Sequence, residues 1–224
     1  MRAIVVSGTG TGVGKTVVAA VLAVVGRAHG LSVAVVKAAQ TGAGRRTIGD
    51  VDTVRRLSGL ADVHELVRYP DPLAPAAAAE RVGVEGFAAD AVAEAVNALG
   101  DRDLVLVEGA GGPLVRLAAD ASTLADVARS LDAAVLLVVR AGLGTLHDTA
   151  ATCEALDARG LRCPGIVIGA WPRQPGVAED CNRRDLPSYA GRPLLGCVPE
   201  GAGRLGTAEF ARRAPDWIAT KGLL

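Results

Sequence analysis

The ten residues SGTGTGVGKT, Ser7 to Thr16, follow an apolar run, Ala3–Val6, and lead into a helical pattern that begins at Lys15. Small residues at this density let successive backbone N–H groups converge on one anion, and the helix start adds the positive end of its dipole. The lysine supplies a point charge for the β and γ phosphates of a nucleotide, and the next hydroxyl can bind magnesium. The stretch therefore predicts a nucleoside triphosphate site. The alternative, a glycine-rich turn without a ligand, is disfavoured because Gly-Lys-Thr between a strand and a helix is a specific signal.

The spacing of this loop departs from the usual pattern. Four residues normally separate the first glycine from Gly-Lys-Thr, but five separate Gly8 from Gly14 here, and Thr9 takes the usual glycine position.

Outward from the loop, short apolar runs alternate with helical patterns. The runs are β-branched and nearly uninterrupted, as in strands buried on both faces, and such alternation predicts one α/β domain over residues 1–224, with a mostly parallel sheet and helices on both faces. The predicted strands are Ala3–Val6, Val33–Val36, Leu104–Val107, Ala133–Val139, Ile166–Ile168 and, more weakly, Leu194–Val198. The predicted helices are Lys15–His29, Val51–Leu57, Phe87–Leu99, Leu124–Ser130, Thr145–Ala158 and Ala208–Thr220, with a loop running into a further helix at Ala74–Ala79.

Composition narrows the class of protein. The 224 residues are 50% hydrophobic, and 24 basic residues balance 24 acidic ones, so no net field favours nucleic acid or an anionic membrane. The four cysteines form no CxxC pair, which favours reduced thiols in a cytoplasmic protein over disulfides or a zinc site. The N-terminus does not have the pattern of a signal peptide, and we expect no membrane span because no apolar run reaches eighteen residues.

Charged residues directly follow three of the predicted strands, at Lys37, Glu108 and Arg140, where ligands bind in open parallel sheets. Lys37 and Glu108 would lie at strand ends near the phosphate loop, and we expect Lys15 and Lys37 to lie outside the core. A second fixed cation there could stabilise a transferring phosphoryl group, and one or two carboxylates suffice for magnesium beside phosphates. Ordinary solvent exposure is the alternative for both. Asp50 is either a magnesium ligand or the N-cap of a helix at Val51–Leu57, and Asp52 is a further candidate ligand.

Three segments in series, GTGTGVGKT, VVKAAQTG and LVEGAGG, resemble the dethiobiotin synthetase family, the ATP-dependent carboxylating cyclases of biotin synthesis. That family has the same five-residue spacing in its loop. The segments APAAAAE, LGTLHDT and PLLGCVPEGA also resemble it in order and position, so the resemblance covers essentially the whole chain. Each motif alone is shared with other phosphate-loop enzymes, but the series is fairly specific. The resemblance implies a P-loop NTPase-like fold.

The resemblance also implies a reaction. The family converts 7,8-diaminononanoate, CO2 and a nucleoside triphosphate into dethiobiotin, through a carbamate and a mixed carbamic–phosphoric anhydride. It implies catalytic roles for Lys15, Lys37 and Thr11, and a magnesium site at Thr16, Asp50 and Glu108. Nucleotide contacts are implied at Gly12, Val13, Gly14, Lys15, Thr16, Val17, Glu108, Gly169, Pro199 and Gly201, and substrate contacts at Lys37, Thr41, Gly111, Gly144, Thr145 and Leu146.

A homodimer is implied as well, because the family holds the substrate carboxylate on backbone N–H groups of the neighbouring subunit, in the stretch that matches Gly144–Leu146. Two departures from the family stand out. His147 replaces a common asparagine, and the run Gly169–Pro172 lacks the asparagine that reads the base in many members. We therefore expect a relaxed or non-adenine preference for the nucleotide base.

Two other classes of phosphate-loop protein fit less well. Glutamine-dependent amidotransferases of the cobyric acid type need a second, glutaminase domain, for which 224 residues leave no room. Partition or division-site ATPases carry an extra lysine four residues before the last glycine of the loop, where this chain has Gly10. The balanced charge and the lack of a basic amphipathic tail also disfavour a DNA or membrane partner.

Overall fold

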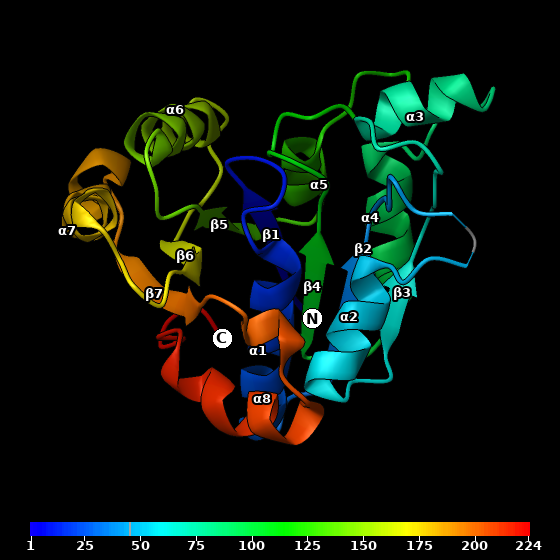
Figure 1. Ribbon diagram of the computed structural model, residues 1–224. Helices are drawn as coiled ribbons and strands as arrows, with labels where there is room; N and C mark the ends of the chain where they lie inside the picture. The colour runs from blue at the N-terminus through cyan, green and yellow to red at the C-terminus, as the bar shows by residue number, and fades with distance from the viewer. Residues whose placement is uncertain (45) are drawn as a thin grey trace.

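The computed structural model describes residues 1–44 and 46–224 and has one parallel sheet of seven strands in the order β3-β2-β4-β1-β5-β6-β7 (Figure 1). The strands are β1 (Arg2–Gly8), β2 (Val33–Lys37), β3 (Val63–Glu65), β4 (Leu104–Glu108), β5 (Ala134–Val139), β6 (Ile166–Trp171) and β7 (Leu194–Pro199). The helices are α1 (Lys15–Ala28), α2 (Asp50–Ser58), α3 (Pro75–Arg81), α4 (Ala89–Asn97), α5 (Leu124–Ser130), α6 (Thr145–Asp157), α7 (Val177–Ala190) and α8 (Thr207–Arg213), with two 3₁₀ helices, η1 (Ala202–Arg204) and η2 (Ala214–Asp216). The predicted α/β class and parallel sheet are confirmed.

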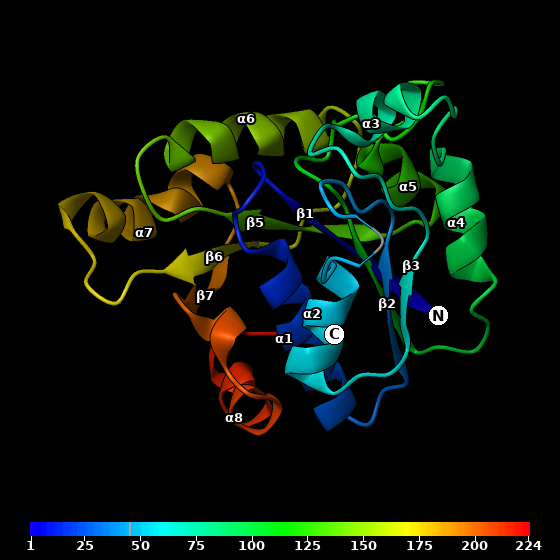
Figure 2. The same cartoon turned by 45° about the vertical axis from the view of Figure 1, so that its right-hand side comes forward.

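Helices cover both faces of the sheet because the central strands are apolar on both. Side chains of β1 such as Ile4 and Val6 pack toward α1, α2 and α8, while Val5 packs toward α4 and α5. Leu137 and Ile168 pack in a further cluster beneath α6 and α7. Figure 2 shows α5 and α6 above the sheet, with α1 and α8 below it. The carboxyl ends of the strands therefore form an edge between the two layers of helices.

Three elements differ from the sequence prediction. The predicted helix Ala208–Thr220 is wrong beyond Arg213, where η2 follows with Pro215 in its first turn. After η2 the chain runs beside β7, and Cys197 N donates to Trp217 O over 3.1 Å. Strand β3 was not predicted because it has three residues, two of them polar. Helix α7 was missed because it is charged, contains Pro187 and buries only three side chains.

Candidate active site

The phosphate loop runs between β1 and α1 and is packed tightly against the end of β6. Gly14 has φ 102°, a left-handed conformation that favours glycine, and a Cβ there would lie 2.5 Å from the carbonyl oxygen of Gly169. A Cβ on Gly169 would overlap the carbonyl oxygen of Val13. Backbone lies directly on backbone at this point, so the glycines fix the position of the loop as well as its shape.

Lys15 opens α1 and is folded back over the loop. Its Nζ donates to the carbonyl oxygen of Gly10 over 2.8 Å, and the residue is only 7% exposed. Burial and the nearby ammonium of Lys37 lower the pKa of Lys15 to about 8, against the opposing effect of Glu108 and Asp50. A phosphate anion would restore the charge that burial disfavours.

Lys37 and Glu108 are register partners across the neighbouring strands β2 and β4. The prediction that Lys15 and Lys37 lie outside the core is wrong, because Lys15 is 7% exposed and Lys37 is 3% exposed; Glu108 is buried as well, at 1% exposed. Lys37 Nζ donates to Glu108 Oε1 at 2.8 Å and to Gly109 O at 3.0 Å, and pairs with Asp50 Oδ2 at 2.5 Å. All three ammonium hydrogens of Lys37 are thereby used.

Thr16 joins the same cluster, because its hydroxyl donates to Glu108 Oε1 over 2.8 Å. Burial raises the pKa of Glu108, and the negative charge of Asp50 raises it further, although the ammonium of Lys37 acts to lower it. Burial opposes the charged form of Lys37 as well, but the two carboxylates outweigh it and raise its pKa. The pKa of Asp50 is lowered, because Lys37 and the hydrogen bonds around that carboxylate outweigh its burial. The cluster is an ammonium held between two carboxylates in a nearly dry site.

Helix α2 brings Asp50 to this cluster as its first helical residue, whereas Gly49 is the N-cap. The capping hydrogen bond comes from Asp52, whose Oδ2 accepts from Gly49 N at 2.9 Å while its Oδ1 pairs with Arg55. The two acids of α2 thus have different roles, and Asp52 is engaged away from Lys37. Gln40 fixes Asp50, since its Oε1 accepts from the backbone N–H of Asp50 over 2.8 Å.

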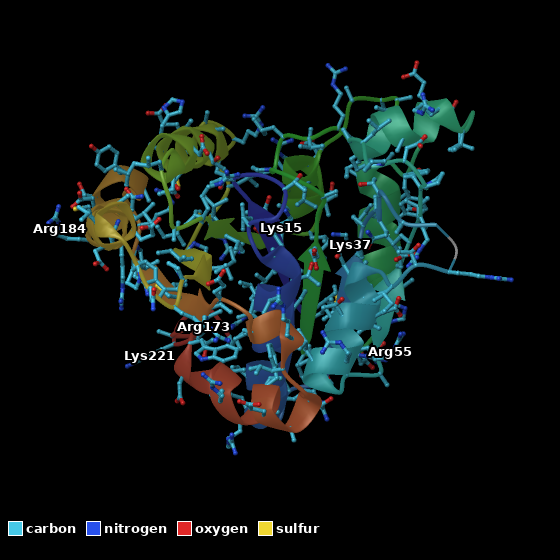
Figure 3. All side chains as sticks on the ribbon, viewed as in Figure 1. Lys15, Lys37, Arg55, Arg173, Arg184 and Lys221 are labelled. Carbon is cyan, nitrogen blue, oxygen red and sulfur yellow. The ribbon has the colours of Figure 1, made fainter. Side chains whose placement is uncertain are left out.

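A cavity of about 750 Å³ opens over the cluster. Figure 3 shows Lys15 and Lys37 near each other at the centre of the molecule, while Arg55 and Arg184 lie at its periphery. The predicted site residues that line the cavity are Thr11, Gly12, Gly14, Lys15, Thr16, Val17, Lys37, Thr41, Asp50, Glu108 and Gly111. Sequence reasoning did not single out Gln40, Pro72, Leu73 or Val115 as site residues; of these, Gln40 lies inside the quoted motif VVKAAQTG.

The remaining predicted residues lie elsewhere. Val13 belongs to the phosphate loop and its side chain is buried. Gly169, Pro199 and Gly201 gather at the ends of β6 and β7, where Glu200 N donates to Trp171 O over 2.7 Å. Of the three, Gly169 contacts the phosphate loop at Val13 and Gly14, and Gly203, two residues after Gly201, lies near Val17 of α1, where a Cβ on Gly203 would be 3.2 Å from that side chain.

Gly144, Thr145 and Leu146 form the start of α6 and do not line the cavity. Gly144 has φ 89°, and His147 beside them is exposed. Within one chain, the structure therefore does not bring these three residues to the phosphate loop's cavity.

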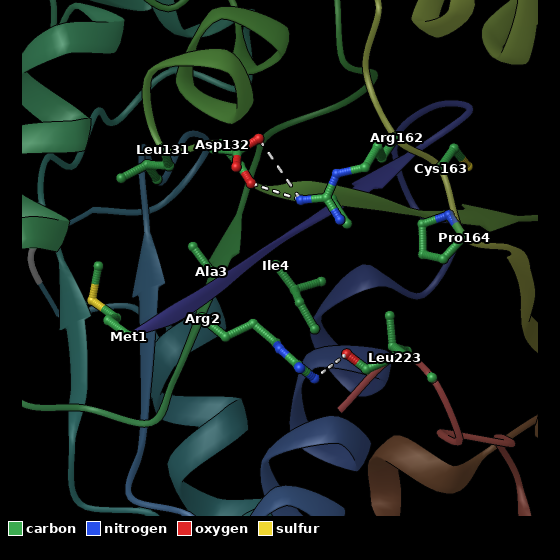
Figure 4. A pocket seen from close by; sticks show the side chains of 12 residues that line it. Met1, Arg2, Ala3, Ile4, Leu131, Asp132, Arg162, Cys163, Pro164 and Leu223 are labelled. Carbon is green, nitrogen blue, oxygen red and sulfur yellow. Dashed lines mark hydrogen bonds and ion pairs between the residues drawn. The ribbon is translucent and has the colours of Figure 1, made fainter.

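A second cavity, of about 710 Å³, lies at the opposite, amino ends of the strands, which we call the amino edge of the sheet (Figure 4). Residues at the amino ends of β1, β5 and β6 line it, including Arg2 and Arg162. Both arginines are already engaged: Arg2 donates to Leu223 O over 3.3 Å and Arg162 to Asp132 O over 2.9 Å. None of the predicted site residues lines this cavity.

Comparison with known proteins shows the family of this chain. A family model described as an AAA domain matches residues 2–203. An ATP-dependent dethiobiotin synthetase of Streptomyces coelicolor is 55% identical over 98% of this chain and 92% of that protein. The chain belongs to the dethiobiotin synthetase family. A relative of the same name from Frankia casuarinae is 57% identical over 94% of this chain and 89% of its own length, and one from Mycolicibacterium vanbaalenii is 50% identical over 97% and 98%.

Several solved structures have a fold similar to that of this chain. The septum site-determining protein MinD of Pyrococcus horikoshii, solved with Mg-ADP, has a TM-score of 0.61 and 23% identity, covering 98% of this chain and 91% of that one. Chloroplast FtsY of Physcomitrella patens has a TM-score of 0.52 and 19% identity, covering 95% and 65%. At these identities the likeness shows the fold alone.

The described residues fit a magnesium ion bound with phosphates. Mg²⁺ is usually bound by one or two carboxylates together with phosphate oxygens and water. Asp50, Glu108 and the hydroxyl of Thr16 converge on this cavity, whereas within residues 1–44 and 46–224 no group of three or more His, Cys, Asp or Glu side chains could hold a metal by itself. The described part of the chain also contains no helix long and apolar enough to cross a bilayer.

Proposed function

We propose that this chain closes the ureido ring of dethiobiotin from 7,8-diaminononanoate, CO2 and a nucleoside triphosphate. The observation that carries the proposal is the buried ammonium of Lys37, held between Glu108 and Asp50 in the same cavity as Lys15. Phosphoryl transfer depends on positioning and charge neutralisation more than on a protein nucleophile, and this site supplies both. Membership of the dethiobiotin synthetase family supports the choice of substrates.

The reaction proceeds in three steps, with the substrate supplying each nucleophile. One amine adds to CO2 and loses a proton, which gives a carbamate. A carbamate oxygen then attacks the γ-phosphorus, and the nucleoside diphosphate leaves. The second amine attacks the carbonyl carbon of the anhydride, and the ring closes as phosphate leaves and a proton is lost.

The two lysines change partners as the substrates bind. Lys15 exchanges the carbonyl oxygen of Gly10 for the β and γ phosphates. Lys37 has no spare hydrogen while Asp50, Glu108 and Gly109 all accept from it, so it must give up a carboxylate before it can hold the carbamate and the γ-phosphate. While both carboxylates contact it, its raised pKa keeps it charged. A preformed cation of this kind stabilises charge that develops on the transferred group.

Thr16, Asp50 and Glu108 would hold magnesium. When bound, the ion would neutralise part of the negative charge of the triphosphate. Asp50 and Glu108, which pair with Lys37 here, would thus also supply the carboxylates of that site.

The diamine lies beside Thr11, Thr41 and Gly111, which share the cavity with Lys37. Its carboxylate is held by the backbone of Gly144, Thr145 and Leu146 from a second copy of the chain. The active enzyme is therefore a homodimer of two copies of the single domain, residues 1–224. The separation of these residues from the cavity within one chain supports this arrangement. The proposed enzyme works in the cytoplasm on small molecules, without a nucleic acid or membrane partner.

The nucleotide base lies by Gly169, Pro199 and Gly201, with a relaxed or non-adenine preference. Gly169 and Ala170 offer no side-chain amide to read the base. Steady-state rates with ATP, CTP, GTP and UTP test this point, and a strict requirement for ATP would contradict it.

The decisive experiment is a coupled assay for nucleoside diphosphate release, with dethiobiotin measured by mass spectrometry. We expect diphosphate release to require both the diamine and bicarbonate, and to match the amount of dethiobiotin formed. Release that is instead stimulated by DNA or lipid vesicles, without cyclic urea, would overturn the proposal in favour of a partition-type ATPase.

A further inference from the structure

Asn182 of α7 is a buried polar side chain outside the phosphate site. It is 6% exposed, and its Nδ2 donates to two consecutive carbonyl oxygens, those of Ala141 at 2.8 Å and Gly142 at 3.0 Å. Burying an amide costs free energy unless its hydrogen bonds are made. The Asn182 amide therefore favours the backbone conformation in which both carbonyl oxygens face it. Asn182 therefore clamps the connection between β5 and α6.

The clamped connection ends at the start of α6. Gly144, its N-cap, has φ 89°, and the backbone N–H groups at this end of the 13-residue helix point out of it. The hydroxyl of Thr145 is buried and has no hydrogen-bond partner among the described residues. Helices α6 and α7 pack side by side, as Figures 1 and 2 both show. The position of the helix start is thus set by a side chain of its neighbour.

We propose that Asn182 is a positioning residue for the carboxylate of the diamine substrate, acting through the start of α6. Carbonyl oxygens repel an anion, and the amide binds those of Ala141 and Gly142, so that they are held toward α7. Among the described residues, Thr145 N makes only a long hydrogen bond of 3.4 Å to Gly142 O, and the N–H groups of Gly144 and Leu146 have no backbone acceptor. This inference rests on the proposed function, because it assigns the clamp to the carboxylate of that substrate. It predicts that the effect passes to the active site of the other subunit.

The first test compares Asn182→Leu and Asn182→Asp with the wild type. Both substitutions keep the volume and remove the donor, and the aspartate also repels the two carbonyl oxygens. We expect the KM for 7,8-diaminononanoate to rise about tenfold, with kcat at saturation and the KM for the nucleotide within about twofold. Asn182→Gln, which keeps the donor, should restore part of the loss, and Asn97→Leu on the exposed end of α4 is the matched control. If the leucine variant fails to fold, the aspartate variant and the glutamine rescue decide the question.

A second probe removes the carboxylate from the substrate instead. The methyl ester of diaminononanoate should have a lower kcat/KM than the acid in the wild type. Asn182→Leu should add little to that loss, because the interaction it weakens is already absent. Equal losses with acid and ester would show a general structural effect and would overturn the inference.

Heterodimers of two different variants test whether Asn182 affects the active site of the other subunit. Co-expression of Lys37→Ala subunits with Asn182→Leu subunits gives heterodimers in which one site combines an intact Lys37 with an intact α6 from the partner. About a quarter of all sites should then regain the wild-type KM. If no site regains it, the clamp acts within its own subunit and the inference is overturned. Failure of the proposed function is distinguishable, because in that case the wild type itself would make no dethiobiotin.

Discussion

The two edges of the sheet carry cavities of similar size, about 750 Å³ at the carboxyl edge and about 710 Å³ at the amino edge. Their chemistry differs. The carboxyl edge buries an ammonium and a carboxylate, those of Lys37 and Glu108, whereas at the amino edge the side chain of Arg162 is 68% exposed and pairs with Asp132, also exposed. Charges that water already solvates need no ligand, but buried ones are kept only for a structural or functional reason. Volume alone therefore does not identify the site.

The largest difference should appear when the buried charge is removed. Lys37→Ala should lower kcat at least about 100-fold, because one phosphate-stabilising charge is lost. It should also lower the free energy of unfolding by about 3–5 kcal/mol, because Glu108 is left buried without its partner. Steady-state kinetics and urea unfolding at pH 7 measure the two effects.

The matched control is Lys221→Ala, since this lysine is exposed near the C-terminus. It should leave both quantities unchanged. A Lys37→Ala variant that keeps near-normal kcat would remove Lys37 from its assigned role.

The packing of the phosphate loop on β6 predicts an effect of intermediate size. Gly169→Ala adds a methyl group against the carbonyl oxygen of Val13, and the loop must shift to accept it. We expect a loss of about 1–3 kcal/mol in stability, together with a several-fold rise in the nucleotide KM. Gly206→Ala, where no atom lies within 4 Å of the new methyl group, is the control. An unchanged nucleotide KM in the Gly169 variant would mean that this contact does not position the loop.

The pKa of Lys15 predicts a smaller effect that can be followed without turnover. At pH 8 this lysine is about half protonated, since its pKa is about 8, and a bound triphosphate favours the charged form. Nucleotide binding at pH 8 should therefore take up about half a proton more in the wild type than in Lys15→Arg, which is always charged. The difference should fall toward zero at pH 6.5, where Lys15 is already protonated. Calorimetry in buffers of different ionisation enthalpy measures it, and equal uptake in both proteins at pH 8 would contradict the lowered pKa.

The sequence predicted the chemical groups of this site better than their surroundings. Gly-Lys-Thr after an apolar run fixed the loop, and Lys37 and Glu108 were recognised at the ends of their strands. Their burial could not be predicted, because it depends on β2 lying next to β4, and strand order is a property of tertiary contacts. The same limit applies to Gly169, whose contact with the loop joins β6 to β1.

The parts of the fold that were missed share a weak apolar pattern. Helix α7 has a polar sequence and a proline, so its periodicity gave no signal, and the clamp by Asn182 was missed with it. Strand β3 has three residues and was too short to detect. The segment after Arg213 looked helical until Pro215 and the pairing along β7 were known.

The smallest effect is expected at the amino edge, and it is the sharpest check on the comparison. Arg162→Ala removes a mostly exposed guanidinium whose partners are the backbone and carboxylate of Asp132. Exposed ion pairs contribute little to stability, and this cavity lies across the sheet from Lys37, so kcat and both KM values should stay within about twofold of the wild type. Steady-state kinetics of the variant provide the measurement. A large change in either KM would show that the cavity at the amino ends of the strands affects the phosphate site. Both cavities would then contribute to activity, in different roles.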